Sequence, residues 1–357
     1  MRDKTVSMSK GVAIILMVLA HTDFSDYGGK FIYMFHMPLF FFLSGYCFKD
    51  TYLTDFRSFA VKRVKGAYWT YVKWGIVFLI LHNLFFRLNL YSVEYGDYLY
   101  GSRDFLTNAI YVIGSMTHAD RLLGGYWFLH SYFVASFMLF LTVWICRNRN
   151  RWLLSALGIL LVVCMLVSGT GIHVPLYVNL KEFMAAIFMI AGYIYKRSEL
   201  NLEKHPVIVV PVCVMLIALG VAFWPGDMTS VNYLKVVPYS ITAVAGSLLV
   251  LSLCHGLSGL KICEHSLTYV GDRTLGILTW HFLSFKLVSL IIVSIYCLPL
   301  SRLGEFPVIV EYSNGGWWLP YTITGVTVPL LMDWLFSRIR VPDMLKTENL
   351  RKNRKKD

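Results

Sequence analysis

Long apolar runs recur along the whole chain and are separated by short polar stretches. An α-helix rises about 1.5 Å per residue, so about 20 apolar residues cross the hydrocarbon core of a bilayer. The pattern predicts an all-α, polytopic integral membrane protein with about ten transmembrane helices. The predicted spans cover residues 7–24, 31–48, 67–88, 125–146, 152–171, 180–195, 206–224, 236–255, 274–298 and 317–336.

The longest polar interruption covers residues 89–123, where we expect a short interfacial helix around 105–113. The other loops are short, and no inverted repeat is evident. Many transporters are built from such repeats, so this pattern counts mildly against a transporter. We expect one integral membrane domain over residues 1–340, followed by a basic tail over 341–357.

Lysine and arginine gather in alternate loops of the ten-span arrangement. Because cytoplasmic loops of membrane proteins carry the excess of these residues, both termini and the tail are expected in the cytoplasm. Besides the tail, the basic side holds Arg2, Lys4, Lys10, Lys49, Arg57, Lys62, Arg63, Lys65, Arg147, Arg149, Arg151, Lys196, Arg197, Lys204 and Lys261. The opposite side holds Lys30, Arg103, Arg121, Lys235 and Arg302.

Composition agrees with a membrane protein. Of the 357 residues, 57% are hydrophobic and 15% are charged, whereas soluble domains have about 25% charged residues. Loop asymmetry and anionic lipid explain the net charge of +12 better than nucleic acid does. The seven cysteines show neither disulfide nor metal-ligand spacing, so no metal site is expected. The N-terminus resembles a signal peptide without a cleavage site, so we expect it to remain as the first span.

Four histidines fall inside predicted spans, where ionisable side chains are costly and are functional candidates by default. His21 lies about 16 Å beyond Lys10 along the first span, and His36 lies about 8 Å below the outer surface. His130 reaches a depth similar to that of His36, and His281 lies about 12 Å above the inner surface. The four could line one cavity. The alternative for each is a bond to a neighbouring backbone carbonyl, without chemistry, but the short loop after His21 makes it and His36 neighbours.

Histidine suits acyl transfer, because an unperturbed pKa of about 6.5 lets it take a proton from a hydroxyl and return it to a leaving group. Lys10 suits the phosphates of a cytosolic acyl donor, although a flanking charge that snorkels to the interface explains its spacing more simply. Arg273 at the inner mouth of the ninth span could bind phosphate or anchor the helix end. Ser44 lacks a nucleophile-elbow motif, so close helix packing at Ser44 and Gly45 is the simpler interpretation.

Three motifs resemble those of the membrane acyltransferase-3 family. The first is a basic residue followed after ten residues by histidine, here Lys10 and His21. The second and most specific is the His-Met-Pro-Leu-Phe-Phe-Phe-Leu-Ser-Gly run at 36–45. The third is a glycine-to-histidine segment over 271–281, and Trp127-Phe128-Leu129 is a weaker fourth. One departure is Ser7, where the family usually has an acidic residue three positions before the basic one.

The resemblance implies an O-acyltransferase, most simply an O-acetyltransferase, that is similar to stand-alone sugar O-acetylases of the fucose-acetylase kind. It implies acetyl-CoA or another acyl-CoA as donor substrate, no permanently bound cofactor, and a sugar hydroxyl of a lipid-linked or exported glycan as acceptor. His21 and His36 would be catalytic, with His21 as general base or acyl relay. Lys10 and Arg273 would hold the donor phosphates, whereas His281, Trp127, His130 and Ser44 would line the pore or acceptor site. The expected location is the bacterial inner membrane, in contact with lipid.

Two other functional classes remain open. A transporter or flippase of a glycan or lipid would use the buried histidines as proton relays. A non-catalytic membrane scaffold would tolerate replacement of His21 and His36. A metalloenzyme is less favoured, because no metal-ligand motif shares a helix face in a span. The acceptor sugar, the acyl chain and the oligomeric state are not readable from the sequence.

Overall fold

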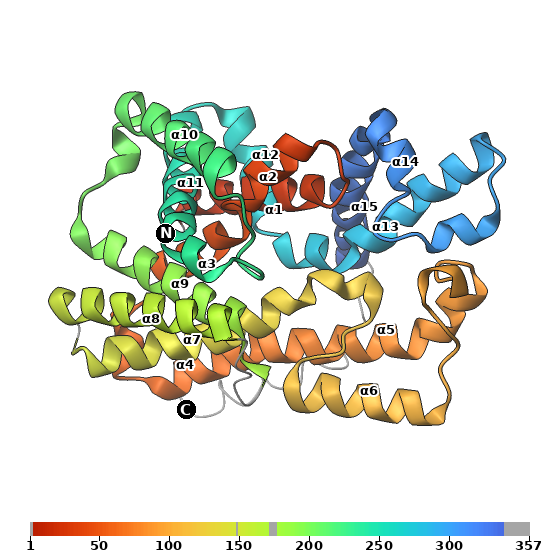
Figure 1. Cartoon of the computed structure of the whole chain (residues 1–357), viewed down its shortest axis with the longest axis horizontal. Coiled ribbons are helices and arrows are strands. Elements are labelled where there is room, and N and C mark those ends of the chain that lie inside the picture. Colours follow the sequence, from red (N-terminus) through yellow and green to blue (C-terminus); the bar gives the residue numbers. More distant parts are fainter. Residues whose placement is uncertain (1–2, 148, 171–176, 339–357) are drawn as a thin grey trace, which may run out of the picture.

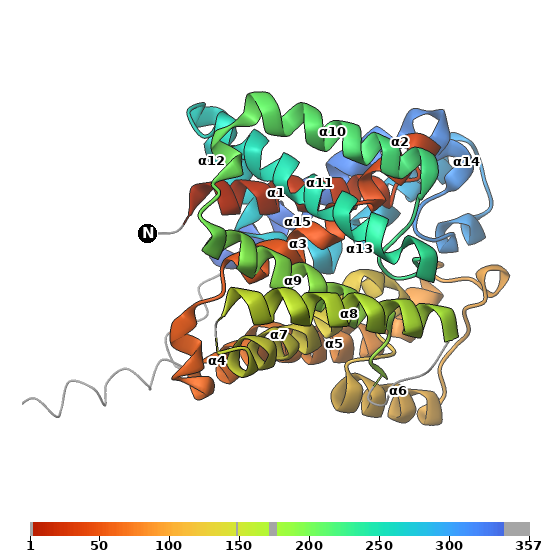
Figure 2. The same ribbon diagram turned by 60° about the vertical axis from the view of Figure 1, so that its left-hand side comes forward.

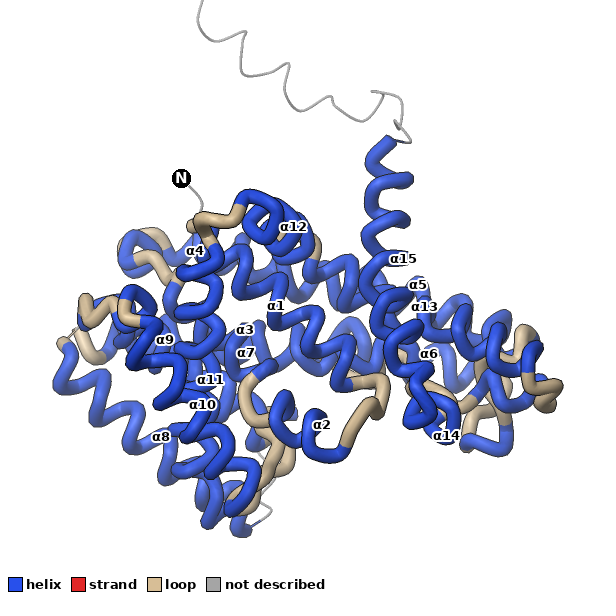
Figure 3. Tube along the Cα trace, turned by 90° about the horizontal axis from the view of Figure 1, so that it is seen from above, coloured by secondary structure: helices blue, strands red, loops and turns tan. Residues whose placement is uncertain are grey.

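The computed structural model describes residues 3–147, 149–170 and 177–338, and the regular elements in these residues are helices (Figure 3). The longer helices are α1 (Lys4–Ala20), α3 (His36–Tyr46), α5 (Trp69–Arg87), α6 (Ser102–Ser115), α7 (Trp127–Ile145), α8 (Asn150–Thr170), α9 (Leu180–Ser198), α10 (Pro206–Phe223), α11 (Val236–Leu257), α12 (Lys261–Gly271), α13 (Thr274–Ile295) and α15 (Trp318–Arg338). Short helices include α2 (Asp26–Tyr33), α4 (Phe56–Arg63) and α14 (Val310–Tyr312).

The all-helical class is confirmed for the described residues. Six helical segments of the described residues are long and apolar enough to cross a membrane: Phe56–Arg87, Arg121–Ile145, Asn150–Thr170, Pro206–Phe223, Tyr233–Leu257 and Thr274–Ile295. The ten-span count and the cytoplasmic location of both termini stay predictions. The tail over 341–357 lies outside the described residues.

The second predicted span, 31–48, is wrong as a single straight helix. Met34 and Phe35 separate α2 from α3, and α3 has only 11 residues, about half of a bilayer core. Pro38 explains the position of the break, because proline cannot donate to the carbonyl four residues earlier, and its ring clashes with that carbonyl, which here belongs to Met34. His36 consequently begins a helix at the centre of the fold.

The helix expected around 105–113 is present and is longer, since it forms the middle of α6. It packs against α5 at one edge of the molecule (Figure 1).

Helix α1 lies among α3, α11, α12, α13 and α15 (Figures 1 and 2). Glycines permit the closest crossings. A Cβ at Gly271 would overlap the Ser7 carbonyl, and a Cβ at Gly45 would overlap the Met189 carbonyl. The second contact joins α3 to α9 and agrees with the interpretation of Gly45 as a packing residue. These crossings hold α1 and α3, the two helices that carry the first site residues, in the interior.

Candidate functional site

One face of α1 carries Lys10, Ile14 and Met17, and the C-cap residue His21 continues that face, at spacings of four, three and four residues. Residues at these spacings lie above one another on a helix, so the four side chains follow a single line. The line covers about 16 Å from the lysine to the histidine. All four side chains line one or both of two adjoining cavities.

The first cavity has a volume of about 400 Å³ and a basic mouth. Lys10, Lys62 and Arg63 line it together with side chains of α3, α7 and α13. Lys62 Nζ donates to the Tyr52 hydroxyl at 3.1 Å, and Arg63 donates to the Tyr132 hydroxyl. Among the described residues, no carboxylate forms an ion pair with any of the three cations, and the Arg63 Nε–H is buried without a partner. The mouth is therefore suited to a polyanion.

The second cavity is smaller, about 130 Å³, and it contains the histidines of α1 and α3. His21 and His36 line it together with Tyr33, Trp127 and Asp227. Three side chains line both cavities, which therefore adjoin: Met17, Met37 and Leu278.

His281 of α13 stacks on His21, with ring centroids 5.7 Å apart and an interplanar angle of 23°. Its Nδ1 lies 3.0 Å from the Ile277 carbonyl oxygen and 3.1 Å from that of Leu278. Because a carbonyl only accepts hydrogen bonds, Nδ1 must carry the hydrogen and Nε2 is the acceptor nitrogen. This Nε2 is buried without a partner among the described residues.

His36 has the same arrangement. Its Nδ1 lies 2.9 Å from the Ile32 carbonyl oxygen, which again leaves the lone pair on Nε2. The carbonyl-bonded state expected as the alternative to chemistry is thus present in His36 and His281. In both residues the bond to the carbonyl occupies only Nδ1. It fixes the tautomer of the ring and leaves Nε2 as the acceptor nitrogen.

Of the four histidines expected to line one cavity, only His21 and His36 line the second cavity, and His281 contacts it only through its stacking on His21. His130 lies elsewhere. Its Nδ1 lies 3.0 Å from Oε1 of Glu182 on α9, and its ring faces a third cavity of about 390 Å³. Trp127 lines both this cavity and the second one. A buried carboxylate on the neighbouring helix draws the imidazole away from the other histidines.

Two other expected site residues have partners that limit their roles. The Arg273 guanidinium pairs with Asp333 at 2.9 Å and stacks on Tyr269, so its charge is already compensated. It lines a fourth cavity, which it shares with Lys10. Ser44 lines the first cavity, and its hydroxyl donates to the Phe40 carbonyl at 2.9 Å.

Ser7 stands where the family usually has an acidic residue, and a carboxylate from another part of the chain lies beside it. The Ser7 hydroxyl donates to Asp272 Oδ1 at 3.1 Å, and Asp272 lines the fourth cavity with Lys10. The carboxylate therefore reaches the same neighbourhood from the link between α12 and α13.

Sequence reasoning missed several residues of these cavities. Lys62 and Arg63 were interpreted only as topology signals. Glu182 had a local signal, since Asn179 and Glu182 form a capping box at the start of α9. Asp227 lies in the loop before α11 and had no signal at all.

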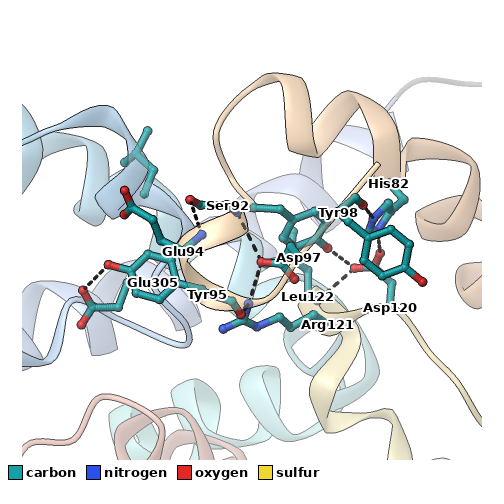
Figure 4. Close-up of polar contacts among 12 residues, drawn as sticks. His82, Ser92, Glu94, Tyr95, Asp97, Tyr98, Asp120, Arg121, Leu122 and Glu305 are labelled. Atoms are coloured by element: carbon teal, nitrogen blue, oxygen red, sulfur yellow. Dashed lines mark hydrogen bonds and ion pairs between the residues drawn. The ribbon is translucent and has the colours of Figure 1, made fainter. Parts of the chain in front are cut away.

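A cluster of polar contacts, drawn in Figure 4, includes Asp120 and Arg121, which line the third cavity. His82 Nδ1 lies 3.0 Å from Asp120 Oδ2, and His82 Nε2 lies 3.1 Å from the Tyr98 carbonyl. Both ring nitrogens face acceptors, which favours hydrogens on both and a charged imidazolium. Tyr91 donates to the other Asp120 oxygen, and burial and this carboxylate raise the pKa of the Tyr91 phenol far above its usual range.

The same cluster continues to the loop before α14. Arg121 pairs with Asp97 at 2.7 Å, and the Tyr95 hydroxyl donates to Glu305 at 3.3 Å (Figure 4). Asp120 and Arg121 both line the third cavity but are already committed to these partners. Their function in the structure is to fix the cavity wall.

Comparison with known proteins agrees with this arrangement. The Acyltransferase domain profile of the acyltransferase-3 family matches residues 6–334. Nodulation protein NolL of Sinorhizobium fredii (strain NBRC 101917 / NGR234) is 29% identical to this chain over 250 residues, which are 66% of this chain and 61% of NolL. No solved structure matches the chain significantly. Since the family profile covers nearly all the described helices, the chain belongs to the acyltransferase-3 family.

Proposed function

We propose that this protein transfers an acyl group, most simply acetyl, from cytosolic acyl-CoA to a sugar hydroxyl of a cell-envelope or exported glycan, in the bacterial inner membrane. One observation carries the proposal. A single face of α1 leads from a basic cavity to a stacked pair of histidines with an unpartnered acceptor nitrogen. Family membership supports the reaction class.

The first cavity suits the donor. Acyl-CoA has an anionic nucleotide end and a long neutral arm that ends in the thioester. Lys10, Lys62 and Arg63 would bind the phosphates, because charge-assisted hydrogen bonds to phosphate are the strong ones. Ile14 and Met17 would contact the arm. The distance of about 16 Å along α1 would then bring the thioester to His21.

The histidine cavity suits the transfer. In the proposed step, the acceptor oxygen bonds to the acyl carbon, the carbon–sulfur bond breaks, and the electron pair leaves with the thiolate. The hydroxyl proton moves to a histidine Nε2 and then to the leaving thiolate. His21 acts as the base or carries the acyl group between donor and acceptor, with His36 and His281 at its sides. Positioned histidine bases contribute about 10²–10⁴-fold to such reactions.

The test uses membranes that carry the protein, radiolabelled acetyl-CoA and the envelope glycan of the same cells. We expect labelled glycan with the wild type, and about 100-fold less with His21→Ala or His36→Ala at equal expression. His265→Asn is the matched control, because His265 is exposed on α12 and lines none of the four cavities. Equal label in all variants would remove the histidines from the chemistry. Absence of label with every acyl-CoA donor would favour a transporter or flippase instead.

A further inference from the structure

The third cavity contains a carboxylate–histidine pair that the donor path does not use. Glu182 has no exposed surface, and three donors satisfy its two oxygens. His130 Nδ1 lies 3.0 Å and Ser131 Oγ 2.6 Å from Oε1, while the backbone N–H of Asn179 donates to Oε2 at 2.8 Å. A buried carboxylate with this many donors is held in one position and retains its charge.

The pair determines the chemistry of His130. Because the carboxylate accepts from Nδ1, the lone pair of the ring lies on Nε2. This nitrogen has no hydrogen-bond partner among the described residues. It is also not one of the polar side-chain atoms that are both completely buried and without a partner there. Together with the place of His130 in the cavity lining, this leaves Nε2 available to a ligand there.

Comparison with the other buried histidines shows what is special about His130. His36 and His281 have carbonyls behind Nδ1, which orient the ring but carry no charge. A carboxylate in that position also stabilises the imidazolium that forms when Nε2 takes a proton. His82 has a carboxylate as well, but its second nitrogen is already bonded to Tyr98. Among the histidines of the described residues, His130 combines a charged partner with an available Nε2.

The surroundings suit a hydroxyl-bearing ligand. Aromatic side chains of Trp127, Tyr71 and Phe306 line the cavity beside polar groups of Thr117 and Asn179. Trp127 also lines the cavity of His21 and His36. A hydroxyl in the third cavity would therefore contact a side chain that also lines the cavity of His21 and His36.

We propose that His130 is the general base for the acceptor hydroxyl and that Glu182 is its positioning residue. This inference rests on the proposed acyl transfer and deepens it, since it leaves His21 the role of acyl carrier. The hydroxyl oxygen bonds to the acyl carbon while its proton moves to His130 Nε2. The bond from the acyl carbon to the His21 ring breaks, and the electron pair stays with that ring. The proton of His130 then passes to the released thiolate or to water.

The test separates the effect of losing His130 Nε2 from the effect of losing the hydrogen bond between His130 and Glu182. In His130→Asn the amide nitrogen takes about the place of Nδ1 and can still donate to Glu182, whereas Nε2 is lost. Two acceptors are compared with radiolabelled acetyl-CoA: the envelope glycan, and hydroxylamine, which is nucleophilic without a base. His21→Ala and His265→Asn serve as the inactive and active controls, and membranes without the protein give the hydroxylamine background.

We expect His130→Asn to lower transfer to glycan by about 100-fold or more and to keep acetylhydroxamate formation near the wild-type rate. Glu182→Gln should lower kcat for glycan with little change in KM for acetyl-CoA, and the double variant should be no worse than His130→Asn alone. Unchanged glycan transfer in His130→Asn would overturn the inference, and so would equal loss of both reactions. If the wild type forms neither product, the acyl transfer itself is refuted.

Discussion

A backbone carbonyl four residues earlier sets the tautomer of both His36 and His281. This hydrogen bond requires no charged partner, and it directs Nε2 away from the helix backbone. A glutamate does the same for His130 and adds a negative charge. At the scale of single residues, the acceptor that is hydrogen-bonded to Nδ1 thus determines the properties of each histidine in the site.

The first prediction concerns His36→Asn and His281→Asn. The asparagine amide can donate to the same carbonyl and lacks Nε2, so the helices should be retained while the nitrogen beside His21 is lost. We expect acetyl transfer to fall by about 100-fold or more in each variant. The measurement is the initial rate with radiolabelled acetyl-CoA at matched protein amount, and activity near that of His265→Asn would contradict it.

The second prediction concerns the basic mouth. Lys62→Gln removes one charge at the first cavity and can still donate to Tyr52. A hydrogen bond to a charged group contributes about 1.5–3 kcal/mol, so KM for acetyl-CoA should rise at least about tenfold. The kcat should change little, because Lys62 lines the first cavity and not the cavity of His21. A fall in kcat at constant KM would place Lys62 elsewhere in the reaction.

Among the secondary-structure elements, close helix crossings and one proline break decide where the site residues lie. Gly192 packs against the Phe42 carbonyl from the α9 side, and Gly45 packs against Met189 from the α3 side. Pro38 interrupts the helix of the second predicted span, so His36 lies at the start of a helix. The site depends on these contacts because α3 carries His36 and α9 carries Glu182.

The third prediction tests the α3–α9 crossing. Gly192→Ala would place a Cβ against the Phe42 carbonyl, and we expect about 1–3 kcal/mol of destabilisation with a lower Tm in detergent. Gly158→Ala is the matched control, since no atom lies within 4 Å of a Cβ there and alanine favours the helix. An unchanged Tm in Gly192→Ala would contradict the crossing.

The fourth prediction concerns the polar cluster of the loop between α5 and α7. Asp120→Asn removes the charge that His82 and Tyr91 face. Breaking a buried charged pair costs about 3–5 kcal/mol, because the other partner stays buried and unpaired. We expect the 89–123 loop to become susceptible to proteolysis at a lower temperature than in the wild type. Asp104→Asn is the control, because Asp104 only caps the exposed start of α6.

Considered as a whole, the molecule has three cavities in series. Met17, Met37 and Leu278 join the first to the second, and Trp127 joins the second to the third. Lys10 and Lys181 line the two ends of this series. In the proposed function, the donor would enter the first cavity and the acceptor would enter the third.

The fifth prediction tests the ten-span topology with cysteines already in the chain. Cys47 follows α3 and Cys297 follows α13, and both are exposed. The ten-span arrangement places Cys47 in the cytoplasm and Cys297 outside. In a Cys263→Ser background, a membrane-impermeant maleimide should label Cys297 in intact cells and Cys47 only after permeabilisation. The reverse pattern would invert the topology, and labelling of both in intact cells would refute the span count.

The sequence by itself determined the helical membrane architecture, the positions of the long helices, and the motifs around His21, His36 and His281. Apolar runs of about 20 residues and short local motifs are properties of neighbouring residues, so they can be read along the chain. The break at Met34 was missed because its cause, Pro38, lies inside an apolar run.

Only the tertiary structure decided which site residues meet. The stacking of His21 on His281, the pairing of His130 with Glu182 and the bond from Ser7 to Asp272 all join residues more than 50 positions apart. Each results from helix crossings whose geometry depends on small residues and buried charges, and hydrophobic periodicity does not specify such pairings. For this reason His21 and His36 line the second cavity, His281 stacks on His21 behind it, and His130 lines the third cavity with its own carboxylate partner.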